Sequence, residues 1–135
     1  MLKLLSLLNI LLMIISTLAL TQGQQVDWSP TKTTVRVGNE LDFNVNMHCK
    51  SSDDDLGNRD IPPTTYTEWS FRANFRGTTL YTCVFQWDSV RKNVVIYDAK
   101  KDEDLCISQC WRILRTDGIY FYNQYKKSWE KRYSW

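Results

Sequence analysis

The chain contains a single histidine, His48, and this scarcity removes whole classes of chemistry. A catalytic pair of imidazoles and a metal site with two or more histidine ligands are both excluded. Glycine and proline are also scarce, with five and three residues among 135, which excludes collagen-like and proline-rich chains. The net charge is only +2 and no long basic run occurs, so we expect no nucleic-acid partner.

The short motifs of common enzymes are missing as well. The sequence has no GxSxG, no HExxH and no glycine-rich phosphate loop. A Ser–His–Asp site would have to use His48, which lies on the polar side of an alternating segment and which we interpret as a solvated surface residue. Paired carboxylates for glycoside hydrolysis need not be close in sequence, but nothing indicates them. We therefore predict that the protein is not an enzyme and that it uses no metal or cofactor.

The N-terminal segment has the pattern of a secretory signal peptide. An apolar stretch from Leu4 to Leu20 follows a positive residue and precedes small or polar residues. Cleavage after Ala19 or after Gly23 fits the small-residue rule, and we favour Gly23. An uncleaved anchor is the alternative, but the stretch is near the short limit for a membrane span. We predict a signal peptide over 1–23, one secreted domain over 24–135, and no stable membrane insertion after cleavage.

Secretion determines how the four cysteines are interpreted. In an oxidising compartment, Cys49, Cys83, Cys106 and Cys110 are expected to form two disulfides. A zinc site is the alternative, but only the last two cysteines form a close pair. Three pairings are open: two join distant cysteines, and the third joins Cys106 to Cys110. We favour Cys49–Cys110, because a bridge that closes a loop of about 60 residues contributes roughly 4 kcal/mol.

The rest of the chain has the pattern of short strands. Apolar and polar residues alternate from Leu41 to Cys49, and no helical period extends over three turns beyond the signal segment. The predicted strands cover 33–37, 41–49, 66–75, 78–87, 93–97, 109–115 and 119–122. About seven strands with turns between them, together with two disulfides, predict an all-β protein: a small antiparallel β-sandwich.

Two turn signals predict hairpins. Gly38-Asn39 lies between the first two predicted strands, and Thr116-Asp117-Gly118 lies between the last two. The longest polar interruptions, at 50–63, 88–92 and 98–103, are expected to be loops. In a rigid sandwich, such loops are where binding surfaces form.

Three further features have competing interpretations. The acidic run Asp53–Asp55 is either a turn after the strand that ends at Cys49 or a set of ligands for a hard cation, and we favour the turn. The six tryptophans can form a sugar-stacking platform, but Trp69, Trp87 and Trp111 lie inside predicted strands and are expected in the core. The basic, aromatic tail 123–135 can contact an acidic or lipid surface. We favour a solvated end that packs one tryptophan against the sandwich.

Several blocks, in this order along the chain, resemble the plant self-incompatibility protein family, the S-protein homologues. The matching residues are Asn39–Leu41, Val45–Gly57, Trp69–Phe71, Asn74–Phe75, Thr79–Cys83, Trp87, Cys106, Cys110–Trp111 and Asp117–Phe121. Each block alone is weak, but together they are specific, and all four cysteines fall within them.

The resemblance implies a small secreted β-sandwich with two disulfides, and we expect the protein to be a monomer. The founding members are poppy stigma proteins that bind a plasma-membrane receptor on pollen, and exposed hydrophilic loops are thought to carry recognition. By position these loops are 52–60, 88–92 and 98–104. The candidate recognition residues are Asp53, Asp54, Asp55, Asn58, Arg59, Asp88, Arg91, Lys92, Lys101, Asp102 and Glu103. A polysaccharide-binding or membrane-surface-binding module is the alternative function.

Overall fold

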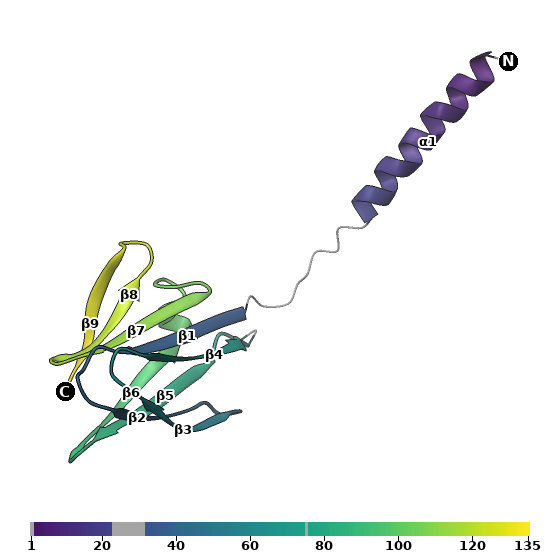
Figure 1. Cartoon of the computed structure of the whole chain (residues 1–135). Helices are drawn as coiled ribbons and strands as arrows, with labels where there is room; N and C mark the ends of the chain where they lie inside the picture. The colour runs from purple at the N-terminus through teal and green to yellow at the C-terminus, as the bar shows by residue number, and fades with distance from the viewer. Residues whose placement is uncertain (1, 23–31, 75) are drawn as a thin grey trace.

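The computed structural model describes residues 2–22, 32–74 and 76–135, and within these ranges nine strands form two facing sheets (Figure 1). The strands are β1 (Lys32–Asn39), β2 (Val45–Lys50), β3 (Asp55–Ile61), β4 (Tyr66–Arg72), β5 (Leu80–Trp87), β6 (Val90–Asp98), β7 (Gln109–Arg115), β8 (Gly118–Asn123) and β9 (Ser128–Ser134). The helices are α1 (Leu2–Gln22) and the single-turn α2 (Ala99–Asp102). The predicted all-β sandwich is confirmed.

The larger sheet has the order β4-β1-β7-β8-β9 and the smaller one β3-β2-β5-β6. All neighbouring strands are antiparallel except β1 and β7, which run parallel. The predicted count of about seven is wrong, because β3 and β9 were missed. Both are edge strands with mostly polar side chains, so their sequences lack the alternation that marks a half-buried strand.

Only one of the two predicted hairpins exists. β7 and β8 pair around Thr116-Asp117-Gly118 as expected. By contrast, β1 and β2 lie in different sheets, and Asn39 makes the corner between them. Its buried side chain donates to the carbonyls of Phe43 and Ile61, both at 2.9 Å, and accepts from the amide of Leu41 at 2.8 Å. Gly38-Asn39 therefore redirects the chain between the two layers.

The core lies between the layers and is formed by alternate residues of the central strands. Val35 and Val37 of β1 face Met47 and Phe85 of the smaller sheet, and all four are fully buried. Burying such side chains contributes about 1.5 to 3 kcal/mol each. The alternation that the sequence shows in these strands therefore supplies the main stabilisation of the sandwich.

The predicted positions of the tryptophans are partly correct. Trp69 is buried and Trp87 packs against the core, as expected, whereas Trp111 is exposed on the outer surface of β7. The C-terminal tail does pack one tryptophan: Trp135 contacts Trp87 at 4.6 Å between ring centroids, and its indole nitrogen donates to the carbonyl of Arg115 at 2.6 Å. The tail is not a loose end, however, because β9 extends the larger sheet.

The predicted signal segment forms α1. Its described side chains, on residues 2–14, are all exposed. Across the described ranges, no helix has both the length and the hydropathy needed to cross a membrane. The predicted cleavage point after Gly23 lies outside the described residues, as does Trp28.

The cysteines pair as Cys49–Cys83 and Cys106–Cys110, so the expected Cys49–Cys110 bridge is wrong. Cys49 of β2 and Cys83 of β5 are direct partners in the ladder, which places their side chains on the same face of the sheet. Cys110 lies in β7 of the other sheet, and its partner Cys106 lies four residues earlier, before that strand begins. The pairing of β2 with β5, which the spacing of cysteines does not reveal, selected the first bridge and left Cys106 and Cys110 to form the second.

These connectivities predict unequal contributions to stability. The bridge that spans 34 residues should contribute about 4 kcal/mol and the bridge that spans four residues about 2 kcal/mol. We expect Cys49→Ala/Cys83→Ala to lower the free energy of unfolding more than Cys106→Ala/Cys110→Ala, as measured by urea denaturation. Peptide mapping of the unreduced protein should recover the two pairs. Recovery of Cys49 linked to Cys110 would contradict this assignment.

Candidate functional site

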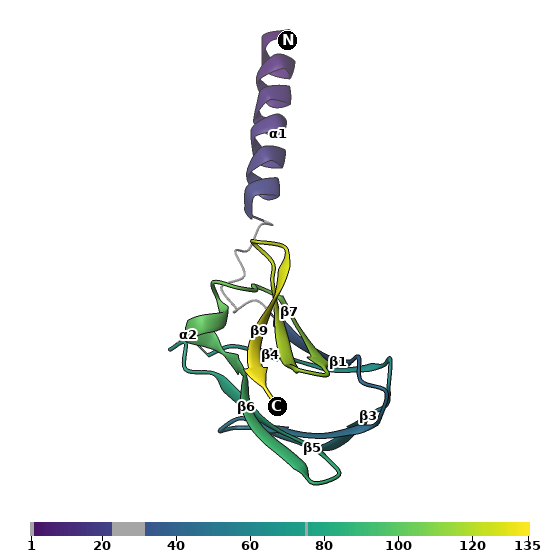
Figure 2. The ribbon, with the colours of Figure 1, turned by 90° about the vertical axis from the view of Figure 1, so that its left-hand side faces the viewer.

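Most of the predicted recognition residues lie at two opposite ends of the sandwich, while Asn58 and Arg59 lie within β3. The β2–β3 turn and α2 lie at the end where β6 finishes, whereas the β5–β6 turn lies at the end where β6 begins. Figure 2 shows α2 and the tip of the β5–β6 hairpin far apart. The three predicted loops therefore do not form one continuous surface.

The acidic run forms a fixed turn, as predicted. The amide of Ser51 donates to the carbonyl of Asp54 at 2.7 Å, and the amide of Asp54 donates to the hydroxyl of Ser51 at 3.1 Å. Within the described part of the chain, the carboxylates of Asp53 and Asp54 have no hydrogen bond and no ion pair, and both residues are exposed. The turn begins two residues after Cys49, so a disulfide secures its base.

A surface hollow of about 500 Å³ lies beside this turn. Its lining is rich in hydroxyl groups and consists of Lys50, Ser51, Ser52, Thr78, Leu80 and Thr82. The two free carboxylates therefore stand next to a polar depression, and together they form a surface that offers both charge and directional hydrogen bonds.

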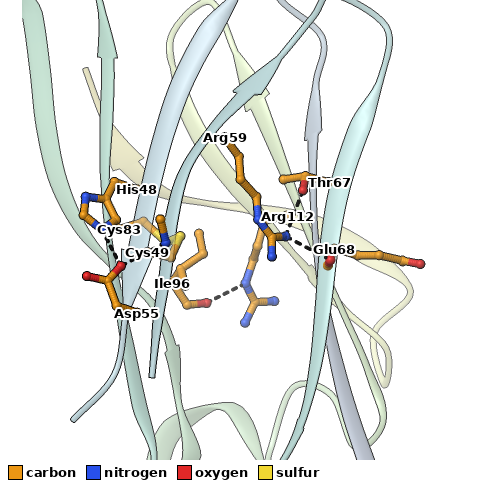
Figure 3. Close-up of a disulfide and its surroundings, with 10 residues drawn as sticks. His48, Cys49, Asp55, Arg59, Thr67, Glu68, Cys83, Ile96 and Arg112 are labelled. Atoms are coloured by element: carbon orange, nitrogen blue, oxygen red, sulfur yellow. Dashed lines mark hydrogen bonds and ion pairs between the residues drawn. A yellow bond between two sulfur atoms is a disulfide. The ribbon is translucent and has the colours of Figure 1, made fainter. Parts of the chain in front are cut away.

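Asp55 has a structural role. It accepts a hydrogen bond from the amide of Gly57 at 2.9 Å. It also accepts one from Nε2 of His48 at 2.6 Å (Figure 3). The hydrogen bond from Gly57 and then the one from His48 lower the pKa of the Asp55 carboxyl below its usual value. His48 is half-buried on the polar side of β2, and among the described residues its ring has no other side-chain hydrogen bond or ion pair. The pair links β2 to β3.

Arg59 is also engaged within the protein. Its Nη1 donates to the hydroxyl of Thr67 and to the carbonyl of Glu68, each at 3.1 Å (Figure 3). Because Arg59 lies in β3 and its acceptors lie in β4, this side chain joins the two sheets along one side of the sandwich. Asn58, its neighbour, is exposed.

The β5–β6 turn presents a separate charged surface. Asp88 is exposed and has a positive φ of 47°, a backbone conformation that Asp tolerates in tight turns. Arg91 is exposed and donates to Gln86 at 3.4 Å, and Lys92 is half-buried.

Asp102 was predicted on an exposed loop, and this prediction is wrong. Only 2% of it is exposed, because its side chain reaches the buried Arg112. Its Oδ2 accepts from the amide of Asp98 at 2.6 Å, and its Oδ1 lies 3.3 Å from Nη2 of Arg112. The flanking residues Lys101 and Glu103 are exposed as expected.

Arg112 is the residue that the sequence analysis missed. It is 1% exposed, its Nε donates to the carbonyl of Ile96 at 3.0 Å (Figure 3), and its guanidinium lies 3.8 Å from the centroid of the Phe121 ring. Burial lowers the pKa of Arg112 to about 10, which still leaves it charged at neutral pH. Its burial could have been inferred from the sequence, because Arg112 lies midway between Cys110 and Leu114, at an inward-facing position of an alternating strand.

No group of three or more His, Cys, Asp or Glu side chains is placed to hold a metal ion within the described ranges. The acidic run is no exception, because Asp55 is hydrogen-bonded to His48 while Asp53 and Asp54 are exposed in the turn. The arrangement at this end of the sandwich is suited to recognition by charge and hydrogen bonding.

Comparison with known proteins gives consistent matches. The family profile described as plant self-incompatibility protein S1 matches residues 34–135. S-protein homolog 6 of Arabidopsis thaliana is 36% identical over 104 residues, covering 76% of each chain. S-protein homolog 2 of the same plant is 36% identical over 115 residues, covering 78% of this chain and 69% of the relative. Self-incompatibility protein S1 of Papaver rhoeas is 38% identical over 89 residues, covering 64% and 63%.

A solved structure has the same fold. It represents the SPH (self-incompatibility protein homologue) proteins, described as a widespread family of small, highly stable, secreted proteins from plants. The TM-score is 0.55 at 18% sequence identity, and the match covers 78% of this chain and 91% of that one.

The buried ion pair predicts a large effect from a single substitution. Asp102→Ala leaves the Arg112 guanidinium buried without its carboxylate and should lower the free energy of unfolding by about 3 to 5 kcal/mol. Asp104, an exposed carboxylate two residues away, serves as a control. Asp104→Ala should change the free energy of unfolding by less than about 0.5 kcal/mol. Urea denaturation measures both. Equal stabilities of the two variants would contradict the importance of the pair.

The lowered pKa of Asp55 predicts a pH-dependent contribution. Because the folded value is below the unfolded value of about 4, the carboxylate stabilises the fold above that pH, and this contribution is lost as the pH falls through the folded value. We expect wild type to be more stable than Asp55→Asn at neutral pH, with the difference disappearing in strong acid. Asp53→Asn removes a carboxylate without a hydrogen-bond partner and is the control. A difference that stays constant with pH would contradict this account.

Proposed function

Because the chain belongs to the plant self-incompatibility protein S1 family, we propose that it is a small secreted protein that binds a cell-surface receptor through exposed turns. The similarity to self-incompatibility protein S1 of Papaver rhoeas supports a role in cell–cell recognition. The signal-peptide pattern over residues 1–23 and the two disulfides agree with a place outside the cell.

The β2–β3 turn is the observation that carries this proposal. Asp53 and Asp54 present two adjacent, unpaired negative charges on a turn that Ser51 holds through hydrogen bonds. Charges that are fixed in place before binding cost little conformational entropy on association and discriminate strongly against partners of the wrong sign. The turn is thus suited to a receptor surface with basic groups.

We propose that the β2–β3 turn, together with Lys101 and Glu103, forms the main contact. The β5–β6 turn at the other end, with Asp88 and Arg91, would then face away from the same receptor molecule. The protein acts by binding rather than by catalysis. In support, the ring of His48, the single histidine of the sequence, is hydrogen-bonded to Asp55 at the β2–β3 hairpin.

The test uses purified, oxidised protein on plasma-membrane vesicles from the plant that makes it. We expect saturable binding that Asp53→Lys/Asp54→Lys weakens by about tenfold or more, with an unchanged melting temperature, because both side chains are exposed. Arg91→Glu at the opposite end is the matched control and should bind as wild type does.

Treatment of the vesicles with trypsin identifies the kind of partner. Loss of binding after trypsin treatment is expected for a protein receptor. Binding that persists on trypsin-treated vesicles would indicate a lipid surface and would overturn the proposal. A control variant that loses as much binding as the turn variant would overturn the assignment to this turn.

A further inference from the structure

The outer face of the larger sheet carries a row of aromatic side chains away from the core. Trp111 of β7, Tyr122 of β8 and Trp129 of β9 lie on adjacent strands, with ring centroids 5.5 Å and 5.0 Å apart. They point outward because their neighbours Cys110 and Phe121 are buried and side chains alternate along a strand. We call these three residues the aromatic platform.

A hollow of about 310 Å³ adjoins the platform. It forms over Gly38 of β1, which has no side chain where its register partners Tyr66 of β4 and Ile113 of β7 have large ones. Trp111 and Trp129 also line it, and Tyr66 is 55% exposed at its edge. This volume is at the lower end of the range for small-ligand sites, about 300 to 1,000 Å³.

Several charged groups around the platform and the hollow are paired with one another, while Lys32 and Arg72 lie farther along the same face of β1 and β4. Arg36 contacts Glu68 at 3.0 Å, Arg115 contacts Glu40 at 2.9 Å, and Lys131 contacts Asp117 at 3.3 Å. Arg36 and Arg115 also lie over aromatic rings, 4.0 Å from the centroid of Tyr66 and 4.6 Å from that of Tyr120. Around the platform and the hollow, the face therefore offers many donors and acceptors in fixed positions, with its neighbouring charges largely balanced.

We propose that this face binds a neutral polysaccharide. A sugar ring has an apolar C–H face that packs on an aromatic ring and a rim of hydroxyl groups that need directional hydrogen bonds. The platform supplies consecutive rings across three strands, the Gly38 hollow receives one sugar unit, and the Arg36–Glu68 and Arg115–Glu40 pairs bind hydroxyl groups. The paired charges complement an uncharged chain. A nucleic acid or an anionic membrane would instead require an excess of free cations.

This binding surface is separate from the proposed receptor-binding turn. The platform lies on the outside of the five-stranded sheet, whereas Asp53 and Asp54 belong to a turn of the four-stranded sheet. The two activities can therefore fail independently. A wall-binding face would retain the secreted protein close to the cell surface on which its receptor lies.

Affinity electrophoresis and calorimetry with defined polymers test the proposal. Xyloglucan, galactomannan and hydroxyethyl cellulose are the neutral probes, and polygalacturonate is the acidic one. We expect binding to at least one neutral polymer, with little change between low and high salt. Failure to bind any neutral polymer would overturn the proposal. Salt-sensitive binding to polygalacturonate alone would overturn it too.

Variants on the face identify the residues responsible. Trp111→Ala should weaken binding of the neutral polymer by about tenfold. Gly38→Leu should weaken it similarly by filling the hollow. A Cβ at this position meets only the carbonyl oxygen of Arg112 and Cγ1 of Ile113, both at 3.8 Å, so the fold should tolerate it. Tyr125→Ala is the control, since Tyr125 is an exposed aromatic that does not line the hollow. Equal losses in all three variants would overturn the assignment.

Discussion

The placement of one buried guanidinium connects most of what is distinctive in this fold. Arg112 extends from the larger sheet into the space between the layers, where it donates to the carbonyl of Ile96 in β6 and pairs with Asp102 of α2. The ion pair lacks hydrogen-bond geometry, since Nη2 and Oδ1 have no hydrogen-bond partner in the described structure. A charge this deeply buried is tolerated only with an opposite charge beside it. Asp102, and with it the segment that carries Lys101 and Glu103, is therefore held in place from the interior.

Side chains also close the open sides of the sandwich. Along one side, the hydroxyl of Tyr133 both accepts from the amide and donates to the carbonyl of Val95, each at 3.2 Å, which satisfies backbone groups of the edge strand β6. Along the other side, Arg59 of β3 donates to the backbone of β4. Unpaired edges invite association with other chains, and these contacts satisfy backbone groups at one residue of each edge without joining the two sheets into a barrel. The frame can thus be stiff while its turns and its outer face stay free for binding.

The quality of the sequence predictions depended on how much of each segment is buried. Strands with one buried face show their alternation in the sequence: β7 was predicted at its observed bounds, whereas the strand predicted over 41–49 begins only at Val45 and ends at Lys50. The polar edge strand β3 was expected to be a loop, because solvent on both sides removes the periodic signal. Asp102 was misplaced for a related reason: a carboxylate in a polar run is expected in solvent, and its buried partner Arg112 lies in another strand. Trp111 was expected in the core because a tryptophan in a strand usually packs inward, yet the register of β7 turns it outward.

By itself, the sequence determined the fold class, the family, secretion, the formation of two disulfides and the acidic turn after Cys49. These properties depend on composition, on local periodicity and on motifs, all of which can be observed along a single chain. The tertiary structure alone decided the disulfide partners, the separation of the predicted loops to opposite ends, the buried Arg112–Asp102 pair and the aromatic face beside Gly38. Each of these depends on which strands become neighbours and in what register, and strand pairing is a long-range choice that the packing of the whole core makes.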